Sequence, residues 1–169
     1  MRRLLAAALL AAALAVAGCG GGSDEPKIVS KDLYIAEGDQ VCASLADRFR
    51  SAGSNNPNTP QQITASANVL ADIYGDLEQK LKDIKPPTAV ADRRGATAYV
   101  AAVGRTGSLL GQLRSSAKSL EDAAKANDAT RVTDAGNAVR GALDAFRASQ
   151  ARANQRALAY GFNLCGNLN

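Results

Sequence analysis

The chain has 169 residues; 46% are hydrophobic, 21% charged and only 4% aromatic, and none is His or Trp. This length fits one domain with a sizeable core, and an apolar content drawn largely from Ala favours closely packed helices over sheets. Because His is the commonest metal ligand and general base, zinc, haem and Ser-His-Asp sites are not expected. We therefore predict an all-α protein that is not an enzyme and has no cofactor or metal.

The formal net charge of +4 does not indicate a nucleic-acid partner. Arg2 and Arg3 lie in a segment that we expect to be removed, which leaves +2 on the 151 residues that follow. The remaining Lys and Arg are spread along predicted helices, with no basic block and no interleaved aromatic residues. The electrostatic pattern that nucleic acid requires is therefore missing.

Residues 1–18 have the layout of an export signal. Arg2-Arg3 form a short positive start, and residues 4–17 form an apolar run of Leu, Ala and Val that is too short for a comfortable membrane span. The run ends in the sequence VAGC at 16–19. This sequence resembles the lipobox of bacterial lipoprotein precursors.

The lipobox resemblance implies cleavage before Cys19 and attachment of a palmitate-type lipid, as a diacylglycerol thioether, to its sulfur. The protein would then be anchored to the cell membrane at its extracytoplasmic face. An ordinary secretory signal that ends in Cys, or an uncleaved anchor, is the alternative. Residues 19–30 begin with GGGSDEP after the Cys and are expected to form a flexible tether.

Two cysteines remain when Cys19 carries the lipid, Cys42 and Cys165. An exported domain lies in an oxidising compartment, where disulfides persist. The spacing excludes a Cys-x-x-Cys redox motif, and no His completes a thiolate metal site. We predict a structural disulfide; two separate buried thiols are the alternative.

Prolines and polar breakers divide the rest of the chain into long segments that are expected to be helical. Ser30 is expected to cap the first segment, Thr59 with Pro60 to open the second, Thr88 to cap the third and Gly161 to end the fourth. A kink near Gly95 is compatible with the several glycines of the third segment. The expected helices cover residues 31–50, 60–84, 89–126 and about 129–160.

Apolar residues recur at helical spacing in each segment. The second segment has the clearest pattern, since Ile63, Leu70, Leu77 and Ile84 are seven residues apart, as in supercoiled helices. Short connections favour an up-down-up-down four-helix bundle over residues 31–169, tied by one disulfide. The remaining inward positions are expected at Ile35, Cys42, Leu45, Phe49, Ile73, Tyr74, Leu81, Tyr99, Val103, Leu110, Leu113, Leu120, Ala124, Val132, Ala135, Val139, Leu143, Phe146, Ala153 and Ala157.

Several motifs suggest chemistry but favour a structural interpretation. Ser115 and Lys118 match the Ser-x-x-Lys pattern of penicillin-recognising enzymes, but the companion motifs are missing, so we expect a solvated polar face. The sequence GSLLG at 107–111 is expected to allow close helix approach. Acidic residues with lysines at 80, 82 and 85 are expected to form surface ion pairs, namely Asp72, Asp76 and Asp83. The four tyrosines are expected at the rim of the core or, alternatively, in a ligand cleft: Tyr34, Tyr74, Tyr99 and Tyr160.

The arginines of the last predicted helix allow two interpretations. Arg147, Arg152 and Arg156 all follow Asp144, the last acidic residue of the chain. Cations near a helix C-terminus are favoured by the helix dipole. The second interpretation is that they contact anionic headgroups, with the tether and the disulfide at the bundle end that faces the bilayer.

The layout as a whole resembles a loose group of small, uncharacterised envelope lipoproteins of high-G+C bacteria. The resemblance rests on the lipobox, GDQVC at 38–42, the Pro-Pro at 86–87 and YGFNLCG at 160–166. It implies architecture and location, and no activity. The leading functional expectation is a non-catalytic, lipid-anchored binding or scaffold module with an envelope protein partner. The alternative is a carrier that holds a small apolar ligand between its helices.

Overall fold

The computed structural model describes residues 28–54 and 56–168, and over these residues the protein is an all-α bundle without strands. The predicted signal, Cys19 and residues 19–27 of the predicted tether lie outside the described residues. The helices are α1 (Lys31–Gly53), α2 (Pro60–Asp83), α3 (Val90–Lys125) and α4 (Ala129–Tyr160), followed by the short 3₁₀ helix η1 (Cys165–Asn167).

Local capping sets most of the helix ends. The Ser30 hydroxyl accepts from the Leu33 N–H at 3.1 Å, and Thr59 forms a reciprocal capping box with Gln62 at the start of α2. Gly161 ends α4 with a φ of 117°, a left-handed conformation that glycine adopts without strain. These predicted ends are confirmed, although α1 continues to Gly53 instead of ending near residue 50.

The prediction for Thr88 is wrong. The N-cap of α3 is Ala89, which makes no side-chain capping bond. The Thr88 hydroxyl instead accepts from the Val29 N–H at 2.9 Å, and the Thr88 N–H donates to the Val29 carbonyl at 3.0 Å. Thr88 therefore ties the segment before α1 to the connection between α2 and α3.

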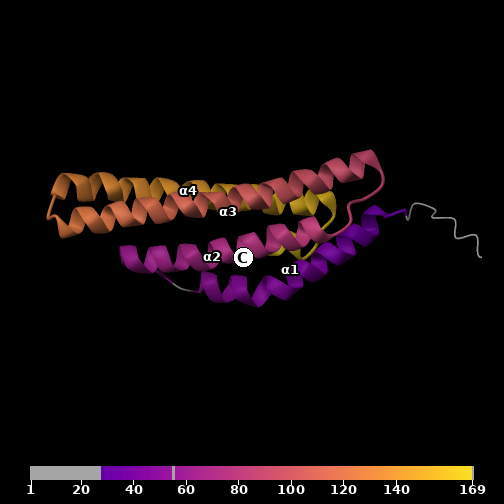
Figure 1. The fold of residues 1–169 in the computed structure, drawn as a ribbon, viewed down its shortest axis with the longest axis horizontal. Coiled ribbons are helices and arrows are strands. Elements are labelled where there is room, and N and C mark those ends of the chain that lie inside the picture. Colours follow the sequence, from indigo (N-terminus) through magenta and orange to yellow (C-terminus); the bar gives the residue numbers. More distant parts are fainter. Residues whose placement is uncertain (1–27, 55, 169) are drawn as a thin grey trace, which may run out of the picture.

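Successive helices run antiparallel, which confirms the up-down-up-down bundle (Figure 1). α3 and α4 are the longest helices, with 36 and 32 residues, and they lie side by side. α2 packs along α3, whereas the 23-residue α1 packs mainly on α2 and on the tail after α4. The α3–α4 pair consequently extends beyond the end of α1 (Figure 1).

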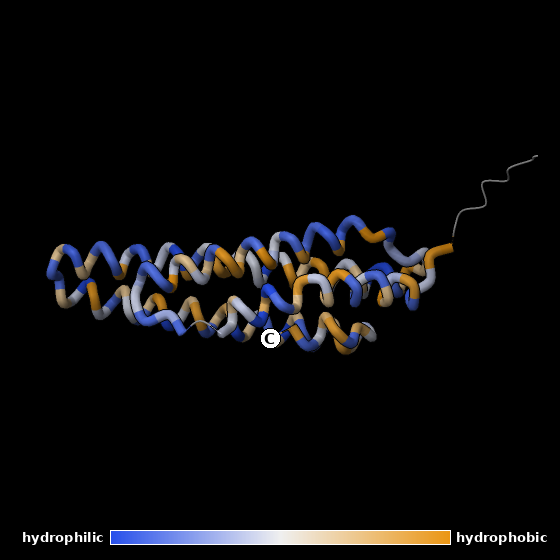
Figure 2. The backbone as a smooth tube through the Cα atoms, turned by 90° about the horizontal axis from the view of Figure 1, so that it is seen from below, coloured by the Kyte–Doolittle hydropathy of each residue, from blue (hydrophilic) through white to orange (hydrophobic). Residues whose placement is uncertain are grey.

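Apolar residues recur along all four helices (Figure 2), but the buried stripe of α2 differs from the seven-residue pattern. Leu77 is 1% exposed, whereas Ile63, Leu70 and Ile84 are only half-buried. The reason is that α2 has neighbours on two sides, α1 and α3, so its buried face is wider than a two-helix seam. Its buried residues are Ala67, Ile73, Tyr74, Leu77 and Leu81.

Similar shifts of register occur in the other helices. Tyr34 is buried in α1 while Ile35 is half-buried, and Ala123 of α3 is buried while Ala124 is exposed. Val132 and Leu143 of α4 are half-buried. α3 is continuous from Val90 to Lys125, and the ring of Tyr160 lies where a side chain at Gly95 would point.

Cys42 and Cys165 form the predicted disulfide, with Cα atoms 5.2 Å apart across a sequence separation of 123. The bridge lies about three turns into α1 and not at the end of the bundle, because the tail folds back after Gly161 (Figure 1). The Asp39 carboxylate helps to hold this tail. Its two oxygens accept from the backbone N–H groups of residues 163, 164 and 165 at 2.9–3.2 Å.

Candidate functional site

An apolar groove lies where α1 stops, between α2, α3 and α4. Its volume is about 490 Å³, within the range typical of small-molecule sites. α1 ends at Gly53, and the polar connection to α2 passes over one edge of the groove. The space that a longer α1 would fill is therefore left between α2, α3 and α4.

Each of the three longer helices contributes aliphatic or aromatic side chains to the groove. Leu110 of α3 is fully buried and Phe146 of α4 is 6% exposed, so they form its floor. Half-buried Leu70 and Leu143 contact the open space from opposite helices. The other apolar residues that line the groove are Ala52, Pro57, Ile63, Ala67, Leu113 and Val139.

Few polar residues line the groove. Ser54, Asn56 and Ser66 supply neutral donors and acceptors, and Arg147 is the one charged residue among the described residues of its lining. An apolar cavity of about 150 Å³ is enough to bind benzene, so this groove has room for a considerably larger apolar body. The arrangement can hold a small apolar molecule by burial.

None of the four tyrosines lines this groove, and all four belong to the core. Tyr34, Tyr99 and Tyr160 surround Phe162 of the tail, with ring centroids 5.1–5.9 Å from its ring. Tyr74 packs edge-on against Phe49 and Phe146. Burial raises the pKa of Tyr74 and Tyr99 well above the usual value of a phenol. The expected position at the rim of the core is therefore wrong.

The other candidate motifs have structural partners. The Ser115 hydroxyl donates to the Gly111 carbonyl at 3.1 Å, and Lys118 pairs with Asp122 at 3.3 Å. In the 107–111 motif, a side chain at Gly107 would lie 3.1 Å from the Tyr74 Cβ, whereas Gly111 faces only Arg114. The close approach between α2 and α3 therefore depends on one of the two glycines.

Of the three acidic residues of α2 predicted to form ion pairs, only Asp76 does so among the described residues, and not with the expected lysines; Asp72 and Asp83 form none. Asp76 pairs with Arg48 of α1, and Lys82 pairs with Glu78 at 2.6 Å. Asp83 accepts a hydrogen bond from Gln79 at 2.8 Å. Over residues 28–54 and 56–168, no three acidic or cysteine side chains gather as metal ligands would, and no helix is long and apolar enough to cross a membrane.

The three arginines of α4 that follow Asp144 do not form one cluster. Arg147 lines the apolar groove. Arg152 and Arg156 line a second hollow between α3 and α4, which shares no residue with the groove. Arg152 is five positions after Arg147, which turns the two side chains about 140° apart on a helix with 3.6 residues per turn.

The groove was not predicted from the sequence, although the sequence carries a signal for it. The first half of α4 carries apolar residues such as Val139 and Leu143. A neighbouring helix has to run along this whole segment to cover them. The first predicted helix, residues 31–50, is too short to do so. The mismatch in helix length therefore indicated an uncovered apolar face.

Comparison with known proteins finds no family model, no curated protein and no solved structure that matches this chain.

Proposed function

We propose that this protein is a lipid-anchored, extracytoplasmic binding module that does not catalyse a reaction, and that its groove beside the end of α1 holds a small apolar ligand. The groove is the observation that carries the proposal. Its size, its apolar floor and its few polar residues match the usual composition of small-molecule sites. The carrier function, second on sequence grounds alone, therefore becomes the leading candidate.

The location rests on two features that support each other. The lipobox at 16–19 implies export and a lipid on Cys19. The Cys42–Cys165 disulfide is suited to an oxidising compartment and would be short-lived in a reducing cytosol. A membrane-held carrier would meet apolar ligands where they are most concentrated, at the bilayer surface.

A scaffold for an envelope protein partner is the second candidate. The observation that favours it is the groove itself, because a partner helix could occupy the place that α1 leaves free. Such a partner would need an apolar stripe that matches Leu70, Leu143 and Phe146.

Binding of an uncharged fluorescent probe separates the two candidates. The full chain, purified in nonionic detergent, is titrated with N-phenyl-1-naphthylamine, and native mass spectrometry records any copurified ligand. Leu143→Lys places a charged chain at the groove and should abolish probe binding, because the cation would have to be buried or displace the probe. Val132→Lys is the matched control, since Val132 is also half-buried on α4 but does not line the groove.

Loss of probe binding in Leu143→Lys, with binding retained in Val132→Lys, supports the carrier. Absence of probe binding by the wild-type chain, or an equal loss in both variants, would overturn it. In that case, cross-linking to an envelope protein that Leu143→Lys alone prevents would support the scaffold.

A further inference from the structure

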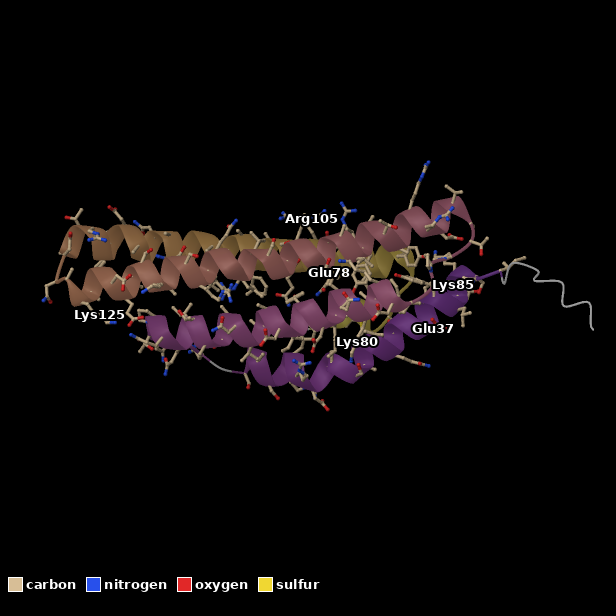
Figure 3. All side chains as sticks on the ribbon, viewed as in Figure 1. Glu37, Glu78, Lys80, Lys85, Arg105 and Lys125 are labelled. Carbon is tan, nitrogen blue, oxygen red and sulfur yellow. A yellow bond between two sulfur atoms is a disulfide. The ribbon has the colours of Figure 1, made fainter. Side chains whose placement is uncertain are left out.

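A second hollow, between α3 and α4, is lined by three exposed arginines. Its volume is about 360 Å³, and it is formed by these two helices alone. Arg105 comes from α3, and Arg152 and Arg156 come from α4. Figure 3 shows Arg105 at the edge of the α3–α4 pair. Glu78, a residue of α2, lies on the other side of α3, between α3 and α2.

No carboxylate lies near these arginines along either helix. α3 has no Asp or Glu between Asp92 and Glu121, and the chain has none after Asp144. At 1.5 Å per residue, Asp92 is about 20 Å from Arg105 along α3, and Asp144 is about 12 Å from Arg152 along α4. Across the helix pair the spacing is shorter: the Thr106–Ser149 and Gly95–Tyr160 contacts place Asp144 about 9 Å from Arg105 and Asp92 about 10 Å from Arg156 along the axis. None of the described carboxylates forms an ion pair with these three arginines.

The three guanidinium groups also have no partner of their own. None of them forms an ion pair or a hydrogen bond with another described residue, whereas Arg48, Arg114 and Arg140 all do. Arg152 and Arg156 are four residues apart, on one face of α4, where like charges repel. An anion bound between them would remove this repulsion.

The serine hydroxyls that line the hollow already donate their hydrogens to other groups. The arginines are therefore the side chains in the lining that can donate to a ligand. The buried Thr106 hydroxyl donates to the Ala102 carbonyl at 3.0 Å, so Ser149, 2.9 Å from Thr106, donates to that same hydroxyl. Ser108 donates to the Arg105 carbonyl at 2.8 Å. Ala102 and Leu109 complete the hollow with apolar surface.

We propose that Arg105, Arg152 and Arg156 form a binding site for a phosphate group. A phosphate monoester has three acceptor oxygens and close to two negative charges, which matches three forked cationic donors better than a single carboxylate does. The hollow is larger than a phosphate, so the group attached to it lies against Leu109.

Two sources can present this phosphate, a soluble phosphate ester or the headgroup of a lipid. The start of α1, which follows the predicted tether, and the end of α4 lie at the same end of the bundle (Figure 1). Arg156 is only one turn before Tyr160, the last residue of α4. A headgroup at the surface that holds the anchor could therefore reach the site. The site shares no residue with the apolar groove, so either proposal can fail without the other.

The test compares two triple variants of the full chain in nonionic detergent at low salt. Arg105→Gln, Arg152→Gln and Arg156→Gln together remove the site. Arg93→Gln, Arg94→Gln and Arg131→Gln together change the net charge equally, at exposed positions outside it. Glycerol 3-phosphate binding is measured by calorimetry. The stabilisation of the fold by lipid is measured by circular dichroism in vesicles of phosphatidylcholine, with and without phosphatidic acid.

We expect the site variant to lose at least tenfold in affinity for glycerol 3-phosphate, or to lose the rise in unfolding temperature that phosphatidic acid causes, while the control variant keeps both. If the site variant loses affinity for glycerol 3-phosphate, a soluble phosphate ester is a sufficient ligand. If it loses only the rise in unfolding temperature in phosphatidic acid vesicles, the ligand is the lipid headgroup. If the wild-type chain responds to neither probe, or if the control variant loses as much as the site variant, the proposal is wrong.

Discussion

Gly38 lies against the ring of Phe162, and Gly38→Ala is therefore expected to destabilise the fold. A Cβ at Gly38 would be 2.4 Å from the Phe162 Cε1 atom, whereas non-bonded carbon atoms normally approach to about 3.5–4.0 Å. The ring has to move by about 1 Å, yet Phe162 is 1% exposed and is enclosed by Tyr34 and Tyr99. Cys165, three residues further on, is fixed by the disulfide.

A matched substitution isolates the magnitude of this clash. Gly75 lies in the interior of α2, and a Cβ there would meet nothing within 4 Å. Both Gly→Ala changes gain about 1 kcal/mol from helix propensity, so Gly75→Ala should stabilise the fold by that amount. In Gly38→Ala, overpacking against Phe162 also lowers the free energy of unfolding, typically by about 1–3 kcal/mol. The two variants should therefore differ by about 1–3 kcal/mol in the free energy of unfolding.

The assay is urea denaturation of both variants, followed by circular dichroism at 222 nm. Phe162→Leu, which shortens the clashing ring, should cost less stability in the Gly38→Ala background than in the wild-type chain, because the two sites are in contact. Equal denaturation midpoints for Gly38→Ala and Gly75→Ala would refute the reasoning, since the clash would then have no energetic cost.

Three further predictions concern the anchor, the bridge and the buried phenols. Cys19→Ala should shift the protein out of the membrane fraction, and recovery of unmodified Cys19 in the mature wild-type protein would contradict this. Reduction of the Cys42–Cys165 bridge should lower the free energy of unfolding by about 5 kcal/mol in the chain-entropy model while helicity remains, and quantitative labelling of both thiols in the native protein would contradict the bridge. Burial raises the folded-state pKa of Tyr74 and Tyr99, so the unfolded chain loses these protons first. Stability should be full below about pH 10 and should fall as the pH rises further, with a smaller fall in Tyr99→Phe; a urea midpoint that does not change with alkaline pH would contradict this.

The helix boundaries could be predicted because their causes are local. Ser30, Thr59 with Pro60, and Gly161 each act on backbone groups within a few residues of themselves. Thr88 had the same residue type as a cap, but its hydroxyl accepts from Val29, 59 residues away in the sequence. A capping residue identified from sequence is therefore reliable only where no distant donor competes for it.

The disulfide could also be predicted, because the expected export and the expected lipid on Cys19 left two cysteines and one pairing. The position of the bridge along the bundle could not. It depends on the tail that turns back after Gly161. The Asp39 carboxylate holds this tail by accepting three hydrogen bonds from backbone N–H groups, and Phe162 packs against Gly38. These contacts join residues more than 120 positions apart, and no local pattern encodes them.

Short segments were enough to predict the class of the fold and the antiparallel order of its helices, because helix periodicity and breakers are local properties. The Cys42–Cys165 pairing could be predicted only together with the expected lipid on Cys19, since three cysteines allow three pairings. Which side chains meet depends on how the helices pack. This packing separates Arg147 from Arg152 and Arg156, places Arg105 from another helix in one hollow with the latter two, and leaves the groove open where α1 stops. The physical reason is that both hollows depend on how the helices lie beside one another and on where each one ends in space, and these relations are fixed by packing across the whole bundle.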